Sequence, residues 1–161
     1  MASRGRILWV DDDGPGRFRY AEGTLKREGW EVDWAADAVG AAQRLGSQHY
    51  DMVILDQEAP IDSGDLRSRW AGCLVLYWLR GSRLNPPGMP RVDHERQRRL
   101  AHGSGPLPTN QRVPVMVISD YDARELLDAM REASPQDRDL PVLSKPLDMI
   151  RLKGLLNQVK G

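Results

Sequence analysis

Short apolar runs alternate with amphipathic stretches along the chain, and each apolar run is followed by a helical pattern. Strands are predicted over residues 6–10, 31–36, 51–56, 113–119 and 140–144. Helices are predicted between residues 14 and 29 and over residues 37–45, 65–79, 122–132 and 152–159. Five strand–helix units in succession predict an α/β fold: a doubly wound, five-stranded parallel sheet with helices on both faces.

Residues 80–112 interrupt this alternation. The segment holds five of the eleven prolines, and its seven arginines against Asp93 and Glu95 give it a net charge of +5, which leaves −5 on the rest of the chain. Long loops without structure are uncommon in compact domains. We interpret the segment as a Pro/Gly/Arg-rich surface insertion, with a helical turn around residues 93–101, in a single domain of residues 1–161. Its removal is expected to leave the fold intact.

Composition narrows the class of protein. The 23 basic and 23 acidic residues balance, which argues against a uniformly basic nucleic-acid binder and against an acidic disordered chain. Cys73 is the single cysteine, so neither a disulfide framework nor a cysteine-rich zinc site is possible. The apolar runs are too short to cross a membrane, and the N-terminus lacks the apolar core of a secretion signal. We therefore expect a cytoplasmic protein that does not act at a membrane.

Polar residues end the predicted strands. Asp11, Asp12 and Asp13 follow the first strand, and Asp56, Ser119 and Lys145 end three of the others. The carboxyl ends of parallel strands meet at one edge, so these side chains are expected to converge in one crevice. Clustered carboxylates repel one another, and a hard cation such as Mg²⁺ would resolve the conflict. A carboxylate there could also attack a phosphoryl group, with an ammonium and a hydroxyl nearby to stabilise the charge.

Four sequence pieces carry a family resemblance. They are RILWVDDD, DMVILD with the nearby Pro60, VPVMVIS and LPVLSKP, each built on a predicted strand. In this order they resemble the CheY-like receiver domain of two-component response regulators, which has a flavodoxin-like fold. The resemblance covers nearly all of the chain outside residues 80–112.

The resemblance implies a role for each matching residue. Asp56 is the expected phosphoacceptor, and the expected Mg²⁺ ligands are Asp11, Asp12, Asp56 and the backbone carbonyl of Glu58. Ser119 matches the switch hydroxyl and Lys145 the phosphate-binding lysine, and the Lys145–Pro146 bond is expected to be cis.

The implied function is that of a stand-alone signalling module and not an enzyme. A histidine kinase or a phosphotransfer protein would donate the phosphoryl group. A surface around residues 122–132 and 140–144 would then engage a downstream protein partner. The arginines of residues 80–112 have no interleaved aromatic residues, so a nucleic-acid partner is not favoured.

Several positions depart from the family pattern. Ala59 replaces the usual methionine, the loop at residues 60–64 has one extra residue, and Asp120 follows Ser119 where a small residue is usual. Asp120 could repel an incoming phosphoryl group. Val142 stands at the aromatic switch position, which puts the usual coupling between hydroxyl and aromatic residue in doubt.

Two alternatives stay open. A degenerate receiver would bind its partner without phosphorylation. A phosphatase that resembles the haloacid dehalogenases would use Asp11 as nucleophile and Asp13 as general acid. That reading leaves Asp56 unexplained and finds no acidic pair after Lys145 to hold the metal.

Overall fold

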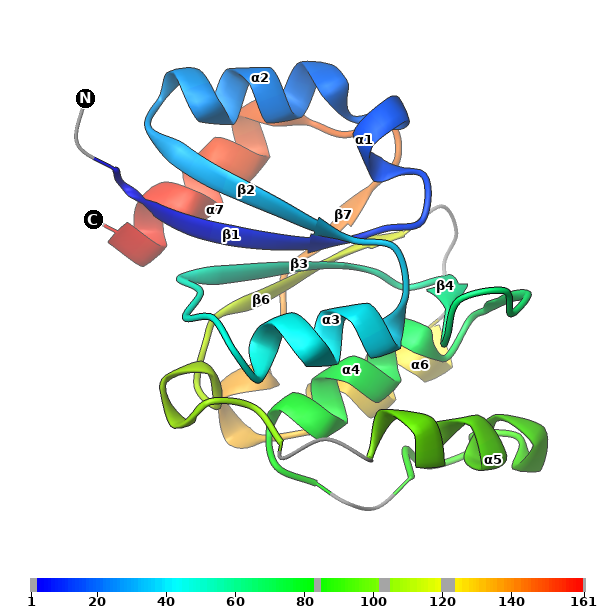
Figure 1. Ribbon diagram of the computed structural model, residues 1–161. Helices are drawn as coiled ribbons and strands as arrows, with labels where there is room; N and C mark the ends of the chain where they lie inside the picture. The colour runs from blue at the N-terminus through cyan, green and yellow to red at the C-terminus, as the bar shows by residue number, and fades with distance from the viewer. Residues whose placement is uncertain (1–2, 83–84, 102–104, 120–123, 161) are drawn as a thin grey trace.

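A five-stranded parallel sheet organises the molecule (Figure 1). The computed structural model describes residues 3–82, 85–101, 105–119 and 124–160. In spatial order the strands are β2 (Trp30–Ala35), β1 (Gly5–Val10), β3 (Met52–Asp56), β6 (Val115–Ser119) and β7 (Val142–Ser144). The strand order reverses between β1 and β3, which is the arrangement of the flavodoxin-like folds. The predicted fold class is confirmed.

Helices cover both faces of the sheet (Figure 1). One face carries α1 (Gly14–Arg17), α2 (Arg19–Arg27) and α7 (Met149–Lys160). The other face carries α3 (Ala38–Leu45), α4 (Ala71–Leu79) and α6 (Arg124–Arg131), with α5 (Arg91–Leu100) beside them. None of the helices in the described ranges is long and apolar enough to cross a bilayer.

The strands are apolar throughout because each helical layer has its own core. In β1, Ile7 and Trp9 belong to the core under α2 and α7, whereas Leu8 and Val10 belong to the core under α3 and α4. All four side chains are at most 1% exposed. A strand buried on both faces shows no polar alternation, which explains the sequence pattern.

The predicted helix over residues 65–79 is wrong in its first part. The segment after β3 forms an antiparallel hairpin of β4 (Ala59–Pro60) and β5 (Arg67–Ser68), and α4 begins only at Ala71. Gly64 turns the chain at a φ of +83°, a conformation that favours glycine. The Ser68 hydroxyl accepts a hydrogen bond from the Trp70 N–H at 3.1 Å, which holds the chain in a turn before the helix.

Residues 80–112 are more than a surface excursion. The segment contains α5 and the 3₁₀ helix η1 (Pro108–Asn110), and a second 3₁₀ helix, η2 (Pro135–Asp137), lies further along the chain. Met89 and Leu100 are buried in the core on the side of α3 and α4. The Arg80 side chain is 3% exposed and makes a two-pronged ion pair with Asp137, at 2.9 and 2.8 Å. Deletion of residues 81–111 would therefore remove core residues, contrary to the sequence-based expectation.

Asn110 joins this segment to the turn before β3. Its Oδ1 accepts the Tyr50 N–H at 2.9 Å, and its Nδ2 donates to the carbonyls of Leu45 and Gln48 at 2.8 and 2.7 Å. The residue is fully buried. The side-chain amide thus provides hydrogen-bond partners for one backbone N–H and two backbone carbonyls.

We predict that Asn110→Ala lowers the free energy of unfolding by about 2–3 kcal/mol, because buried backbone groups lose their partners. The neighbouring substitution Gln111→Ala is the control. That side chain is exposed, and its loss should change stability by less than about 0.5 kcal/mol. Urea denaturation of the two variants measures the difference. Equal stabilities would contradict the anchoring role of Asn110.

Candidate functional site at the carboxyl ends of the strands

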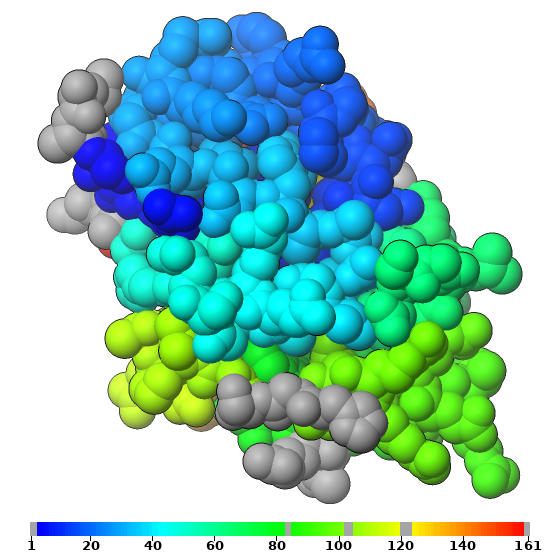
Figure 2. Space-filling view, in the orientation of Figure 1, coloured from blue at the N-terminus to red at the C-terminus, as the bar shows by residue number. Residues whose placement is uncertain are grey.

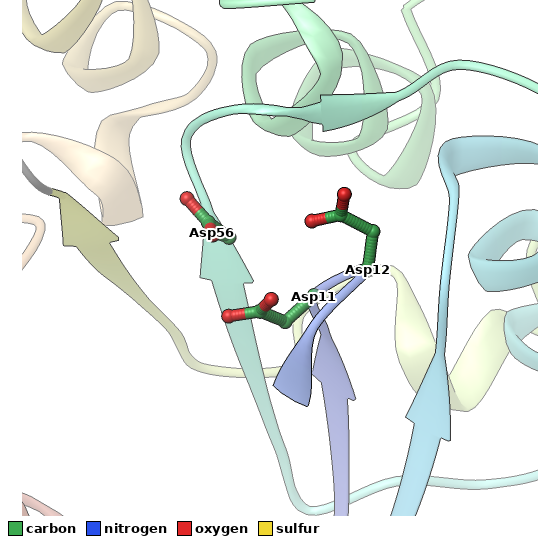
Figure 3. A group of neighbouring side chains, drawn as sticks. All are labelled: Asp11, Asp12 and Asp56. Atoms are coloured by element: carbon green, nitrogen blue, oxygen red, sulfur yellow. The ribbon is translucent and has the colours of Figure 1, made fainter. Parts of the chain in front are cut away.

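Three carboxylates meet where the strand order reverses (Figure 3). Asp11 and Asp12 follow β1, and Asp56 is the last residue of β3. One carboxylate oxygen of each lies within 4.8 Å of those of the other two. Asp11 and Asp56 are buried, whereas Asp12 is exposed. The predicted convergence of these residues at one edge of the sheet is what the structure shows.

Backbone N–H groups orient the two buried carboxylates in the same way. The Asp13 N–H donates to Asp11 Oδ1 at 2.9 Å, and the Glu58 N–H donates to Asp56 Oδ1 at 3.1 Å. Each bond joins an aspartate to the residue two positions later, which turns the chain away from the strand at that point. After this turn α1 begins at Gly14, where a Cβ atom would collide with the Trp34 ring.

The electrostatics of the group favour a bound cation. Burial raises the pKa of Asp11 to about 6, and the charge of Asp56 adds to the rise, while the Asp13 N–H and Lys145 oppose it. Asp11 Oδ2 is buried and has no hydrogen-bond partner among the residues the structure describes. Carboxylate oxygens are the ligands that Mg²⁺ takes in proteins, so this donor set fits that ion.

Lys145 supplies a fixed positive charge. Its Nζ donates to Asp56 Oδ2 at 2.8 Å, and its side chain is only 3% exposed. The ammonium also lies 5.9 Å from the centre of the Phe18 ring, and the Lys145 N–H bonds to the Ser119 carbonyl at 3.0 Å. The Lys145–Pro146 peptide bond is cis, as expected. β7 therefore delivers the ammonium to the acid on β3, across β6.

Ser119 ends β6 next to the acid-bearing strand. Its hydroxyl donates to Oε1 of Gln57 at 2.8 Å, and both side chains are buried. Gln57 Nε2 has no hydrogen-bond partner in the described part of the chain. Sequence reasoning did not single out Gln57, because a glutamine after a strand carries no motif. Asp120, the other residue expected to affect this corner, lies outside the described residues.

Arg67 is a second functional candidate that sequence reasoning missed. Its Nε lies 3.4 Å from Asp12 Oδ2, and its Nη2 lies 3.6 Å from Asp56 Oδ2. The same Nη2 donates to the carbonyl oxygen of Glu58 at 3.1 Å. The extra residue in the loop at residues 60–64 was the one available signal, but nothing in the sequence showed that a hairpin would return an arginine to the site.

Three other positions that the sequence singled out are not part of the acid group. Asp13 is exposed and is not one of the three clustered carboxylates. Ala59 is fully buried at the start of the hairpin. Val142 is half-buried against the core on the side of α3 and α4, where it pairs with Val117 of β6. Whether Val142 alters the coupling to Ser119 stays a prediction.

Sequence comparison gives a partial match. No protein-family model matches the chain. The transcriptional regulatory protein CutR of Streptomyces coelicolor is 38% identical over 60 residues, which are 37% of this chain and 27% of that protein. The matched stretch thus spans about a quarter of the length of this curated relative.

Solved structures with the same fold cover almost the whole chain. A putative response regulator from Chloroflexus aurantiacus matches with a TM-score of 0.64 at 19% identity, over 97% of both chains. The receiver domain of the Francisella response regulator 1452 matches with a TM-score of 0.62 at 18% identity, over 97% of this chain and 96% of that one.

A third neighbour was solved with a metal. The receiver domain of the sensor histidine kinase PA1611 from Pseudomonas aeruginosa, described with magnesium coordinated in its active-site cleft, has a TM-score of 0.63 at 18% identity, over 98% of both chains. With the sheet order and the acidic edge, these likenesses show that the chain has the CheY-like fold of response regulator receiver domains.

Proposed function

We propose that the chain is a cytoplasmic phosphoacceptor receiver module of a two-component phosphorelay, which takes a phosphoryl group on Asp56 with Mg²⁺. The observation that carries the proposal is the 2.8 Å contact between Lys145 Nζ and Asp56, inside a cluster that also contains Asp11 and Asp12. A nucleophilic carboxylate, a fixed ammonium and a cation-binding acid pair are the groups that phosphoryl transfer needs.

The chemical step is the formation of an aspartyl phosphate. A carboxylate oxygen of Asp56 attacks phosphorus, the O–P bond forms, and the P–N bond to a phosphohistidine of a kinase or phosphotransfer protein breaks. The imidazole leaves with the electron pair of that bond and takes a proton. Lys145 then stabilises the charge on the phosphoryl oxygens as a compact ammonium.

The residues that would hold the metal are Asp11, Asp12, Asp56 and the backbone carbonyl of Glu58. Support comes from the spacing of the carboxylates and from the buried Oδ2 of Asp11, which has no hydrogen-bond partner within the described ranges. Mg²⁺ would neutralise negative charge on the phosphoryl oxygens during transfer. The magnesium described in the PA1611 receiver domain is consistent with this assignment.

Ser119 is the group we propose to report phosphorylation. Its hydroxyl is bonded to Gln57, so turning toward a phosphoryl group on Asp56 would exchange that bond for a charge-assisted one. The exchange shifts a conformational equilibrium only if the phosphoryl group contacts one state better than the other. We propose that the partner-binding surface includes α6, which is the next helix after Ser119 in the chain, and β7, whose Ser144 pairs with Ser119. The output we propose is protein binding and not catalysis.

We predict that the protein gains one phosphoryl group when it is incubated with Mg²⁺ and acetyl phosphate, and that Asp56→Asn abolishes the gain, because an amide cannot form the acyl phosphate. Intact mass spectrometry measures the adduct. Asp13→Asn is the matched control: this exposed carboxylate lies outside the acid group, and the variant should form the adduct at the wild-type rate.

Two results would contradict this proposal. Steady hydrolysis of a phosphomonoester that survives Asp56→Asn and is lost in Asp11→Asn would establish the phosphatase alternative. Partner binding that is unchanged by acetyl phosphate, with no adduct on the wild-type chain, would establish a receiver that works without phosphorylation.

A second prediction concerns Lys145. Lys145→Met should lower the free energy of unfolding by about 3 kcal/mol, because it leaves the buried Asp56 carboxylate without its closest counter-ion. It should also slow adduct formation at least tenfold. Lys153→Met, which removes a half-exposed ion pair with Glu28, is the control for a lost lysine. Denaturation and time-resolved mass spectrometry measure both effects, and an adduct rate equal to that of the control would contradict the role of Lys145.

A further inference from the structure

The guanidinium of Arg67 contacts three oxygens at the site. Asp12 Oδ2, Asp56 Oδ2 and the carbonyl oxygen of Glu58 lie 3.4, 3.6 and 3.1 Å from its nitrogens. These oxygens belong to three of the four groups to which we assign the divalent cation. Arg67 therefore contacts the same groups that would bind the cation.

The hairpin fixes Arg67 in this place. Pairing of β4 with β5 puts Arg67 opposite Pro60. Because Pro60 is only four positions after Asp56, this pairing returns Arg67 to the acid group. The hairpin lies against α5 (Figure 2), where Arg99 contacts Asp62 and Asp65 at 3.5 and 2.8 Å. Ion pairs with α5 thus hold the hairpin that carries Arg67. The position of Arg67 at the acid group is therefore set by the hairpin and its contacts with α5.

Charge balance makes Arg67 and a divalent cation rivals. The three carboxylates carry −3 when ionised, and Lys145 and Arg67 contribute +2. A divalent cation bound to these oxygens would carry the same sign of charge as the guanidinium beside it, so the two would repel each other. Burial lowers the pKa of Arg67, but the surrounding acids, first among them Asp12 and Asp56, raise it by a larger amount. The pKa of Arg67 therefore lies above its ordinary value.

Geometry points the same way. A magnesium ion holds its oxygen ligands at about 2.1 Å in a near-octahedral shell. The Arg67 guanidinium donates to the Glu58 carbonyl at 3.1 Å and contacts the Asp12 and Asp56 carboxylates, so it already engages three of the groups that would form this shell. At 41% exposure, the Arg67 side chain also has solvent into which it can move.

We propose that Arg67 is a built-in counter-ion that competes with the divalent cation for Asp12, Asp56 and the Glu58 carbonyl. In the metal-free protein it suppresses the repulsion among the carboxylates, and metal binding requires it to swing out of the site. The inference rests on the proposed function, because it assumes that the acid group binds a metal.

Calorimetric titration of the metal-free protein with MgCl₂ tests the inference. Arg67→Met keeps the apolar stem and removes the charge, and we expect it to lower the Mg²⁺ dissociation constant about five- to tenfold, the scale of a few partly screened ion contacts. Arg69→Met is the matched control, since Arg69 is an exposed arginine two residues away, and it should bind like the wild type. Arg67→Lys keeps the charge but has a single nitrogen in place of the two that make these contacts, so its Mg²⁺ dissociation constant should fall between those of Arg67→Met and the wild type.

A second readout uses thermal unfolding and does not depend on phosphorylation. In EDTA, Arg67→Met should melt below Arg69→Met because the carboxylates lose a counter-ion, and Mg²⁺ should raise its melting temperature more than that of the control. If Arg67→Met melts like Arg69→Met in EDTA, and Mg²⁺ raises the two melting temperatures equally, competition between Arg67 and the cation is contradicted.

The outcomes separate this inference from the function on which it rests. If all variants bind Mg²⁺ with the same affinity, the metal site stands and competition by Arg67 is refuted. If Arg67→Met binds more weakly than the wild type, Arg67 assists the metal and the inference is also refuted. If none of the proteins binds Mg²⁺, both the metal-dependent function and the inference fail.

Discussion

Mutual repulsion among Asp11, Asp12 and Asp56 is the constraint around which this end of the molecule is built. The sheet brings their carboxylates within 4.8 Å of one another, and two of them are buried. Such a group persists only where positive charge lies close by. Lys145 provides it from inside the fold at 2.8 Å, and Arg67 provides it from the solvent side at 3.4 Å or more. The two positive charges differ in freedom, because the Lys145 side chain is 3% exposed whereas that of Arg67 is 41% exposed and can move into solvent.

The sheet and the inner part of the site could be predicted because both depend on short-range patterns. Apolar runs that end in Asp11–Asp13, Asp56 and Ser119 identify strands buried on both faces, and parallel pairing brings their ends to one edge. The positions that could not be predicted depend on tertiary contacts. No periodicity distinguishes the hairpin that carries Arg67 from a loop that leads directly into α4, so the helix was predicted six residues too early. The bond between Ser119 and Gln57 likewise depends on side-chain orientation, which residue spacing does not determine.

Residues 80–112 show how composition can mislead. Their prolines and arginines are typical of a solvated loop, yet Met89, Leu100 and Asn110 are buried, and Arg80 is held by Asp137. Several of the arginines face acids of the domain itself: Arg99 contacts Asp62 and Asp65, and Arg96 contacts Asp65 and Asp93. The opposite net charges of the segment and of the remaining chain are therefore partly matched within the molecule. This matching connects α5 to the hairpin and, through Arg67, to the acid group.

We propose that the acid group accepts a divalent cation and a phosphoryl group once the Arg67 guanidinium has left it. A crystal structure grown with Mg²⁺ and beryllium trifluoride, a phosphoryl mimic, tests it most directly. We expect the mimic bonded to an oxygen of Asp56 and within reach of Lys145, a metal ion ligated by Asp11, Asp12, Asp56 and the Glu58 carbonyl, and the Arg67 guanidinium outside that shell. Asp56 without the mimic, and Arg67 still bonded to the Glu58 carbonyl at saturating ligand, would contradict it.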